Sequence, residues 1–252
     1  MGYLDIKDVS IAFGGNQALK DVNISFVPGR ISSIIGPNGA GKSTLLNLIN
    51  SFYRFYQGNI EFEGHALKRL SPYKVSSLGI GRTFQNIELF KNMTALENLL
   101  LGCHNLMEHS FFSDVFYYGK SLKNDLHFRQ HVEEIIDFLE MEKWRNYLVS
   151  SIPLGVQKRV ELGRALAMNP KVLLLDEPTA GMNTEETEDI TRFILDIHEE
   201  KNIDVILIEH AMDVVMDISD YIYVLEFGLK IAEGTPEEVQ SNEEVIRAYL
   251  GE

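Results

Sequence analysis

One stretch limits the possible folds of this chain more than any other. Residues 36–43 read Gly-Pro-Asn-Gly-Ala-Gly-Lys-Ser. They fit the pattern G-x-x-x-x-G-K-[ST], which binds nucleotide phosphates when it connects a strand to a helix. Both neighbours are expected here, because 31–35 reads as a short buried strand with isoleucine at three positions and 42–50 has leucine and isoleucine at helical spacing. The chain is therefore expected to contain an α/β nucleotide-binding core.

Each residue type in this loop indicates a role. Glycines allow the backbone to approach a phosphate closely, so that successive N–H groups can point at its oxygens. Lys42 would place a positive charge on the β- and γ-phosphates, and the Ser43 hydroxyl would bind Mg²⁺. The residues expected to contact the nucleotide are Asn38, Gly39, Ala40, Gly41, Lys42, Ser43 and Thr44.

Composition narrows the class of protein. The chain has 252 residues, of which 45% are hydrophobic, so it can bury a substantial core. A net charge of −14 argues against nucleic acid as a partner. The single cysteine, Cys103, suits a reducing compartment and is expected to be a buried apolar residue. No signal peptide and no apolar run of membrane-spanning length is recognisable, so any membrane span is expected to come from other chains.

The order of the patterned segments predicts the organisation of the chain. Apolar and polar residues alternate in two segments of 3–27, on either side of a turn, which is typical of antiparallel strands. Another short strand is expected within 58–64. The pattern is helical over 86–168, where Val132, Ile135, Ile136 and Leu139 share one helix face. We expect a single domain in which residues 1–85 and 169–252 form the α/β core and residues 86–168 form an inserted helical subdomain.

Strands and helices alternate again in the last third of the chain. Buried strands are expected at 172–175 and 205–208, and a closing hairpin is expected around Phe227. Asn183 and Glu186 are expected to cap one helix, and Thr235 with the following proline and glutamates to begin the last helix. The aromatic run 111–118 is either a surface for a partner or part of the helical core.

Four polar residues could complete a hydrolytic site. Asp176 and Glu177 follow the buried strand 172–175, where an aspartate could bind Mg²⁺ and a glutamate could act as general base on water. His210 follows the buried strand 205–208 and could orient that water near the γ-phosphate. Gln85 could reach the metal through its amide oxygen, although sequence logic alone does not distinguish it from any loop glutamine. An Asp-Glu pair after a strand could also be a helix cap.

These motifs, in this order, resemble the ATP-binding subunits of ABC transporters over nearly the whole chain. The resemblance implies an ABC ATPase core with an antiparallel β subdomain and an inserted helical subdomain. It implies ATP and Mg²⁺ as cofactors, with Phe13 stacked on adenine, 36–44 as the Walker A loop and Gln85 as the Q-loop glutamine. It also implies that Asp176 is the Walker B aspartate, Glu177 the catalytic glutamate and His210 the switch histidine.

The same resemblance implies partners and a location. A second ABC ATPase subunit would form a dimer with the chain, and transmembrane permease subunits would hold both at the cytoplasmic face of the inner membrane. An external solute-binding protein would act indirectly. The runs 81–90, 179–183, 207–213 and 230–236 are similar to those of branched-chain amino-acid importer ATPases. Close relatives serve urea and amide importers, and the lipopolysaccharide exporter ATPase shares most motifs.

The family's signature sequence departs from its usual form in this chain. The pattern L-S-G-G-Q aligns with 152–156, so that Pro153 replaces the serine and Val156 the glutamine, whereas Gly155 remains to face a partner's phosphate. The departure predicts that this chain's own Walker A site, completed by a partner's intact signature, is the better of two sites. A weakly hydrolysing regulatory subunit is therefore an alternative. A DNA-repair or translation ATPase is a further alternative, but no paired module, coiled-coil arm or basic surface is recognisable.

Overall fold

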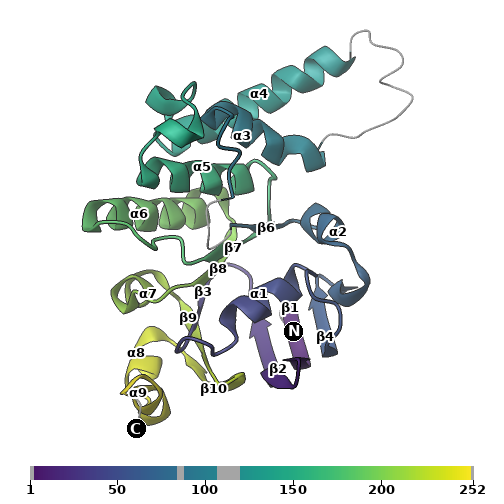
Figure 1. Cartoon of the computed structure of the whole chain (residues 1–252), viewed down its shortest axis with the longest axis vertical. Helices are drawn as coiled ribbons and strands as arrows, with labels where there is room; N and C mark the ends of the chain where they lie inside the picture. Colours follow the sequence, from purple (N-terminus) through teal and green to yellow (C-terminus); the bar gives the residue numbers. More distant parts are fainter. Residues whose placement is uncertain (1–2, 84–87, 107–119, 251–252) are drawn as a thin grey trace.

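The computed structural model describes residues 3–83, 88–106 and 120–250. Two β-sheets and their flanking helices form the body of the molecule, and the helices α3, α4 and α5 gather at one end of it (Figure 1). The expected combination of an α/β core, an antiparallel β region and a helical region is confirmed.

The larger sheet carries the parallel strands of the core. Its order is β10-β9-β3-β8-β7-β6, in which β6, β7, β8, β3 and β9 are parallel and β10 is antiparallel to β9. Helices cover both faces of such a sheet, so its central strands are buried on both sides. Both β3 and β7 are buried at all five positions. The strands are β3 (Ile31–Ile35), β6 (Ile80–Arg82), β7 (Val172–Asp176), β8 (Asp204–Ile208), β9 (Tyr221–Glu226) and β10 (Leu229–Gly234).

The smaller sheet is antiparallel, in the order β2-β1-β4-β5. Alternate side chains of β1 and β2, such as Leu4, Ile6, Val22 and Ile24, are buried, which explains the alternation in the sequence. Their core continues into residues of the larger sheet. The strands are β1 (Leu4–Phe13), β2 (Asn16–Phe26), β4 (Gln57–Phe62) and β5 (His65–Ala66).

Several helices pack around the larger sheet and begin where the sequence supplies a cap. Asn183 and Glu186 form the expected capping box of α6. Thr235 and Glu238 form that of α8, but α8 is not the last helix as expected, because α9 follows it after a short turn. The helices are α1 (Lys42–Ile49), α2 (Pro72–Ser77), α6 (Thr184–Lys201), α7 (Met212–Ile218), α8 (Pro236–Gln240) and α9 (Glu243–Leu250), with a 3-10 turn at Leu67–Arg69.

The helical region consists of α3 (Ala95–Gly102), α4 (Lys120–Phe138) and α5 (Leu154–Leu166), with 3-10 turns at Cys103–Leu106, Glu142–Trp144 and Val149–Ser151. The face of α4 identified from the sequence is buried, and so is Cys103. These side chains belong to the same hydrophobic cluster as Leu173 and Phe193 of the core. Division of the chain at residues 86 and 168 stays a prediction, and the aromatic run 111–118 lies outside the described residues. No helix in the described ranges is both long and apolar enough to cross a bilayer.

Candidate active site

The loop between β3 and α1 needs glycine at positions where the backbone is crowded. A Cβ on Gly36 would lie 1.9 Å from the carbonyl oxygen of Leu225, and one on Gly41 would lie 2.6 Å from that of Ala18. Both residues also have positive φ, +147° and +102°. Because Gly41 is the residue that precedes α1, the loop delivers its backbone N–H groups to the start of that helix.

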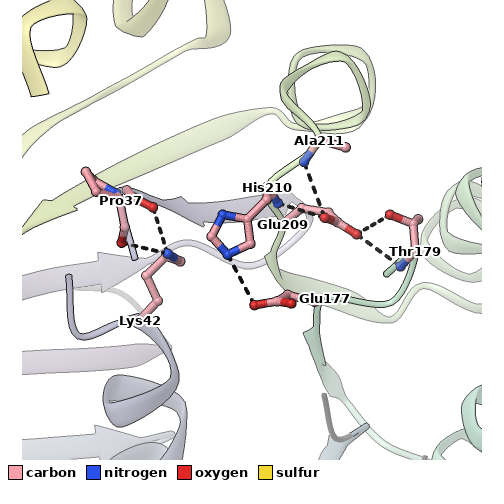
Figure 2. A network of polar contacts seen from close by, with 8 residues as sticks. Pro37, Lys42, Glu177, Thr179, Glu209, His210 and Ala211 are labelled. Carbon is pink, nitrogen blue, oxygen red and sulfur yellow. Dashed lines mark hydrogen bonds and ion pairs between the residues drawn. The ribbon is translucent and has the colours of Figure 1, made fainter. Parts of the chain in front are cut away.

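Lys42 begins α1 and lies back across the loop. It is buried, and its Nζ donates to the carbonyl oxygens of Gly36 (2.7 Å) and Pro37 (3.1 Å), as Figure 2 shows. Burial lowers the pKa of the Lys42 ammonium, against the opposing effect of the Glu177 and Asp176 carboxylates. The ammonium therefore lies inside the phosphate loop, next to two carboxylates.

Asp176, at the end of β7, is held by an arginine from the neighbouring strand. Its Oδ2 lies 3.1 Å from an Nη of Arg82 at the end of β6, and both side chains are buried. The other Nη of Arg82 donates to Oδ1 of Asn47 in α1 (2.7 Å). Burial raises the pKa of Asp176, and the Arg82 charge opposes that rise. Arg82 thus links the carboxylate to the helix that begins with Lys42.

The donor set at this point fits a hard cation. Oδ1 of Asp176 is buried and has no hydrogen-bond partner among the described residues. The Ser43 hydroxyl, at the start of α1, would offer a second oxygen ligand. Mg²⁺ typically binds one or two protein oxygens together with substrate phosphates. Gln85 lies outside the described residues.

Glu177 and His210 come together from neighbouring strands. Glu177 follows β7 and has a positive φ of 50°, and its N–H donates to the carbonyl oxygen of Ile208 at 2.8 Å. His210 follows β8, and its Nε2 lies 3.2 Å from Oε1 of Glu177 (Figure 2). The Glu177 side chain is 16% exposed and that of His210 42%. Glu177 is therefore largely shielded from solvent, whereas His210 is open to it, and both can reach a ligand.

These groups border a cavity of about 680 Å³, a size suited to a nucleotide. Nine of the expected site residues line it. They are Asn38, Gly39, Ala40, Gly41, Lys42, Ser43, Thr44, Glu177 and His210. Two strand ends and the phosphate loop thus open into one space.

Three other expected site residues lie outside the lining of this cavity. Asp176 is buried, 2% exposed. Phe13 packs against Tyr53 and Phe55, at ring-centroid distances of 5.0 and 5.7 Å. Gly155 lies in α5, where a Cβ would come within 2.8 Å of Oε1 of Glu186. The adenine-stacking role of Phe13 and the phosphate-facing role of Gly155 stay predictions.

The cavity also has residues that sequence reasoning did not identify. Asn16, Gln17 and Ala18 from the start of β2, and Phe227 from the turn between β9 and β10, complete its lining. Phe227 is 83% exposed and has a positive φ of 44°. The turn is fixed to the phosphate loop, because the N–H of Gly228 donates to the carbonyl oxygen of Ala40 at 3.1 Å. A large aromatic residue at an exposed turn was the available signal for this position.

Pro153 occupies the N-cap position of α5 and provides no side-chain cap. Its φ of −58° and ψ of 157° are values that serine also adopts at a helix N-cap. The neighbouring Gln157 donates from Nε2 to the carbonyl oxygen of Ile152 at 2.9 Å. The start of α5 thus has the backbone geometry of a capped helix without a capping hydroxyl.

Comparison with known proteins agrees with this geometry. Residues 19–180 match the family model described as ABC transporter, and residues 230–252 match that of the branched-chain amino acid ATP-binding cassette transporter. The chain is similar to the high-affinity branched-chain amino acid transport ATP-binding protein BraF of Pseudomonas aeruginosa, with 37% identity over 249 residues covering 99% of this chain and 98% of the relative.

Solved structures resemble the fold closely. A nucleotide-free ATP-binding cassette from an ABC transporter matches with a TM-score of 0.86 and 35% identity, covering 100% of both chains. A dimeric ATP-binding cassette in a post-hydrolysis state, bound to ADP and Pi, matches with a TM-score of 0.77 and 26% identity, covering 92% of this chain and 98% of that one.

Proposed function

The chain belongs to the ABC transporter ATP-binding family, and on that premise we propose that it is the ATPase that energises an importer of branched-chain or other hydrophobic amino acids. The observation that carries the proposal is the single cavity shared by the phosphate loop, Glu177 and His210. The amino-acid class is supported by the C-terminal match at 230–252 and by the name of the similar Pseudomonas protein.

Each group has a chemical task in this proposal. The loop amides and Lys42 would bind the β- and γ-phosphates, and Phe13 would stack on adenine. Ser43, Asp176 and Gln85 would hold Mg²⁺, which neutralises charge on the phosphates when it is bound. Glu177 would accept a proton from the attacking water, and the 3.2 Å contact with His210 would fix the direction of its carboxylate.

A second ABC ATPase subunit would complete the site. Gly155 and the start of α5 would face the nucleotide of that subunit, and the partner's signature would face the nucleotide bound here. Backbone N–H groups at a helix start attract phosphate even without a serine side chain. The resemblance to a dimeric cassette supports this arrangement.

A groove of about 330 Å³ is the proposed contact with a transmembrane permease. It lies between the core and the helical region, and its lining includes Phe52, Phe90 and Leu101, which are 50%, 56% and 39% exposed. Exposed large apolar side chains that gather in one groove are typical of a protein contact. Arg82, which binds Asp176, lines the same groove, so the contact would lie one residue away from the metal site. The chain would thereby be held at the cytoplasmic face of the membrane, and a solute-binding protein would act on the other side.

One observation favours a second candidate, a regulatory subunit with weak hydrolysis. Pro153 leaves α5 without the side-chain hydroxyl that the family signature provides. Because the start of α5 would face the partner's nucleotide, this subunit would support hydrolysis there only weakly, whereas Glu177 and His210 in its own site argue against the regulatory role. Transport of urea or amides, or export of lipopolysaccharide, would use the same ATPase chemistry with a different permease.

The test is to purify the membrane complex and identify the co-purifying chains by mass spectrometry, then to measure ATP turnover with and without the permease. We expect permease subunits in the complex, turnover stimulated by them, and binding of a branched-chain amino acid to the associated solute-binding protein. The Lys42→Ala variant should lose nucleotide binding while its circular dichroism remains that of the native fold. Unaltered ATP affinity in that variant would contradict the loop assignment, and a complex that turns over only slightly would favour the regulatory subunit.

A further inference from the structure

The side chain of Glu209, the residue before His210, connects the segment after β8 to the segment that carries Glu177. It follows β8 directly and is buried, 4% exposed. One carboxylate oxygen, Oε1, accepts hydrogen bonds from the backbone N–H of Thr179 (3.0 Å) and from the Thr179 hydroxyl. The other, Oε2, accepts from the N–H groups of His210 (2.7 Å) and Ala211 (3.4 Å), as Figure 2 shows.

The two oxygens of this carboxylate therefore serve two different strand ends. Thr179 is two residues beyond Glu177, after β7, whereas His210 and Ala211 follow β8. A side chain with two acceptor oxygens is needed, because every one of the four partners is a donor. Burial of a carboxylate is costly unless it is hydrogen-bonded, and here both oxygens accept hydrogen bonds.

The backbone has one further connection in the same place. The N–H of Glu177 donates to the carbonyl oxygen of Ile208, which precedes Glu209. The segment after β7 is therefore joined to the end of β8 and the residue after it at two points, by Glu177 N–H to Ile208 and by Thr179 to Glu209. The side chains of Glu177 and His210 leave this joined backbone on the cavity side, where they meet.

We propose that Glu209 is a positioning residue that fixes the separation of Glu177 and His210 through Thr179. The proposal rests on the proposed function, in which Glu177 and His210 act on the attacking water. Loss of the Glu209 contacts would leave the two segments joined by the hydrogen bond from Glu177 N–H to Ile208 but would release Thr179 from the turn that carries His210. An error of about 1 Å in the position of a reacting group can reduce a rate about 100-fold. ATP binding, which depends on the phosphate loop, would be retained.

Three variants of the assembled transporter test this inference. Glu209→Gln replaces one acceptor oxygen by an NH₂ group. In either orientation of the amide, that NH₂ group faces backbone N–H donors, of Thr179 or of His210 and Ala211. Thr179→Val removes the hydroxyl and retains both the shape and the backbone N–H. Thr179→Ser restores the hydroxyl. We expect kcat to fall about 10- to 100-fold in Glu209→Gln, with KM for ATP within about twofold, and to fall in Thr179→Val but recover in Thr179→Ser.

A control distinguishes this role from a general structural one. Glu238 in α8 also accepts a backbone hydrogen bond, from the N-cap residue Thr235 (2.9 Å), and it lies outside the lining of the cavity. Glu238→Gln should leave kcat unchanged. If Glu209→Gln does not fold, the Thr179→Val and Thr179→Ser pair decides the matter by itself.

The outcomes separate the inference from the proposed function. A wild-type complex without ATP turnover would overturn the proposed function, whatever the variants do. Wild-type turnover with kcat unchanged in Glu209→Gln and in Thr179→Val would overturn the positioning role alone. The effects of substitutions at contacting residues in one hydrogen-bond network are usually not additive. The double variant Glu209→Gln with Thr179→Val should therefore be little slower than Glu209→Gln alone. A double variant whose loss equals the product of the two single losses would also contradict the inference.

Discussion

Nε2 of His210 lies 3.2 Å from Oε1 of Glu177, although 33 positions separate the two residues in the chain. The contact exists because β7 and β8 are parallel neighbours in the larger sheet, with Asp176 paired to Ile208 at their ends. The carboxyl ends of parallel strands are where such folds bring functional side chains together.

Replacement of Glu177 by glutamine tests its proposed role as general base. The amide cannot accept the proton, so hydrolysis should slow by about 10²–10⁴ while ATP is still bound. Single-turnover hydrolysis and equilibrium ATP binding measure the two effects separately. Glu200→Gln, an exposed position near the end of α6, is the matched control and should be neutral. Near-normal turnover in Glu177→Gln would remove this residue from the reaction.

Replacement of Arg82 by methionine should destabilise the nucleotide-free protein. It leaves the buried Asp176 carboxylate without its partner at 3.1 Å, and removal of one member of a buried pair costs about 3–5 kcal/mol. Denaturant unfolding measures the loss. Arg192→Met, which breaks ion pairs of an arginine that is 45% exposed, is the control and should cost at most about 1 kcal/mol. The double variant Arg82→Met with Asp176→Asn should recover stability, and failure to recover would show that the charge is not the cause.

Restoration of the signature should increase turnover of the assembled transporter. Pro153→Ser combined with Val156→Gln supplies the missing groups, and a charge-assisted hydrogen bond of about 1.5–3 kcal/mol corresponds to a ten- to hundredfold gain in rate or occupancy. Serine at this N-cap should also stabilise α5 by about 1 kcal/mol. Thermal unfolding must therefore be measured beside ATPase activity. Pro153→Ala, which removes the ring and adds no hydroxyl, is the control. Higher stability without faster turnover would mean that the departure is silent.

Cys103 should be unreactive in the folded protein. Burial raises the pKa of its thiol to about 11, from an ordinary value of 9.0, so at pH 8 the reactive thiolate is about 100-fold scarcer than in the unfolded chain. The raised pKa also has a stability consequence. The contribution of this thiol is full below the unfolded pKa and is lost as the pH rises through about 11, because the unfolded chain ionises first. Labelling by a thiol reagent, with and without denaturant, checks the first statement. Rapid labelling of the native protein would contradict it.

Local signals predicted much of the fold. The phosphate loop with its flanking strand and helix, and the capping boxes of α6 and α8, are encoded within a few neighbouring residues. The short strand β6 was not predicted, because three residues give no alternation to detect. Its terminal Arg82 meets Asp176 across 94 positions, a contact that depends on strand order.

The candidate site residues were indicated by equally local signals. Strand ends indicated Asp176, Glu177 and His210 as candidates, because a buried apolar run followed by a charged residue is visible in the sequence. The link from Glu209 to Thr179 was not visible, because both residues look like ordinary members of their segments. Phe227 was likewise read only as a turn, since nothing local says that this turn adjoins the phosphate loop.

The order of the larger sheet has a consequence for how this enzyme can change over evolution. Strand β8 separates β3, which leads into the phosphate loop, from β7, which ends in Asp176. Adjacent strands lie about 4.8 Å apart, so β3 and β7, on either side of β8, are held roughly 10 Å apart by the backbone hydrogen bonds of the sheet. The gap across which a triphosphate must fit is thus set by the main chain and is insensitive to side-chain substitution. The surface proposed to contact a permease can therefore diverge while the spacing of these strands is inherited unchanged.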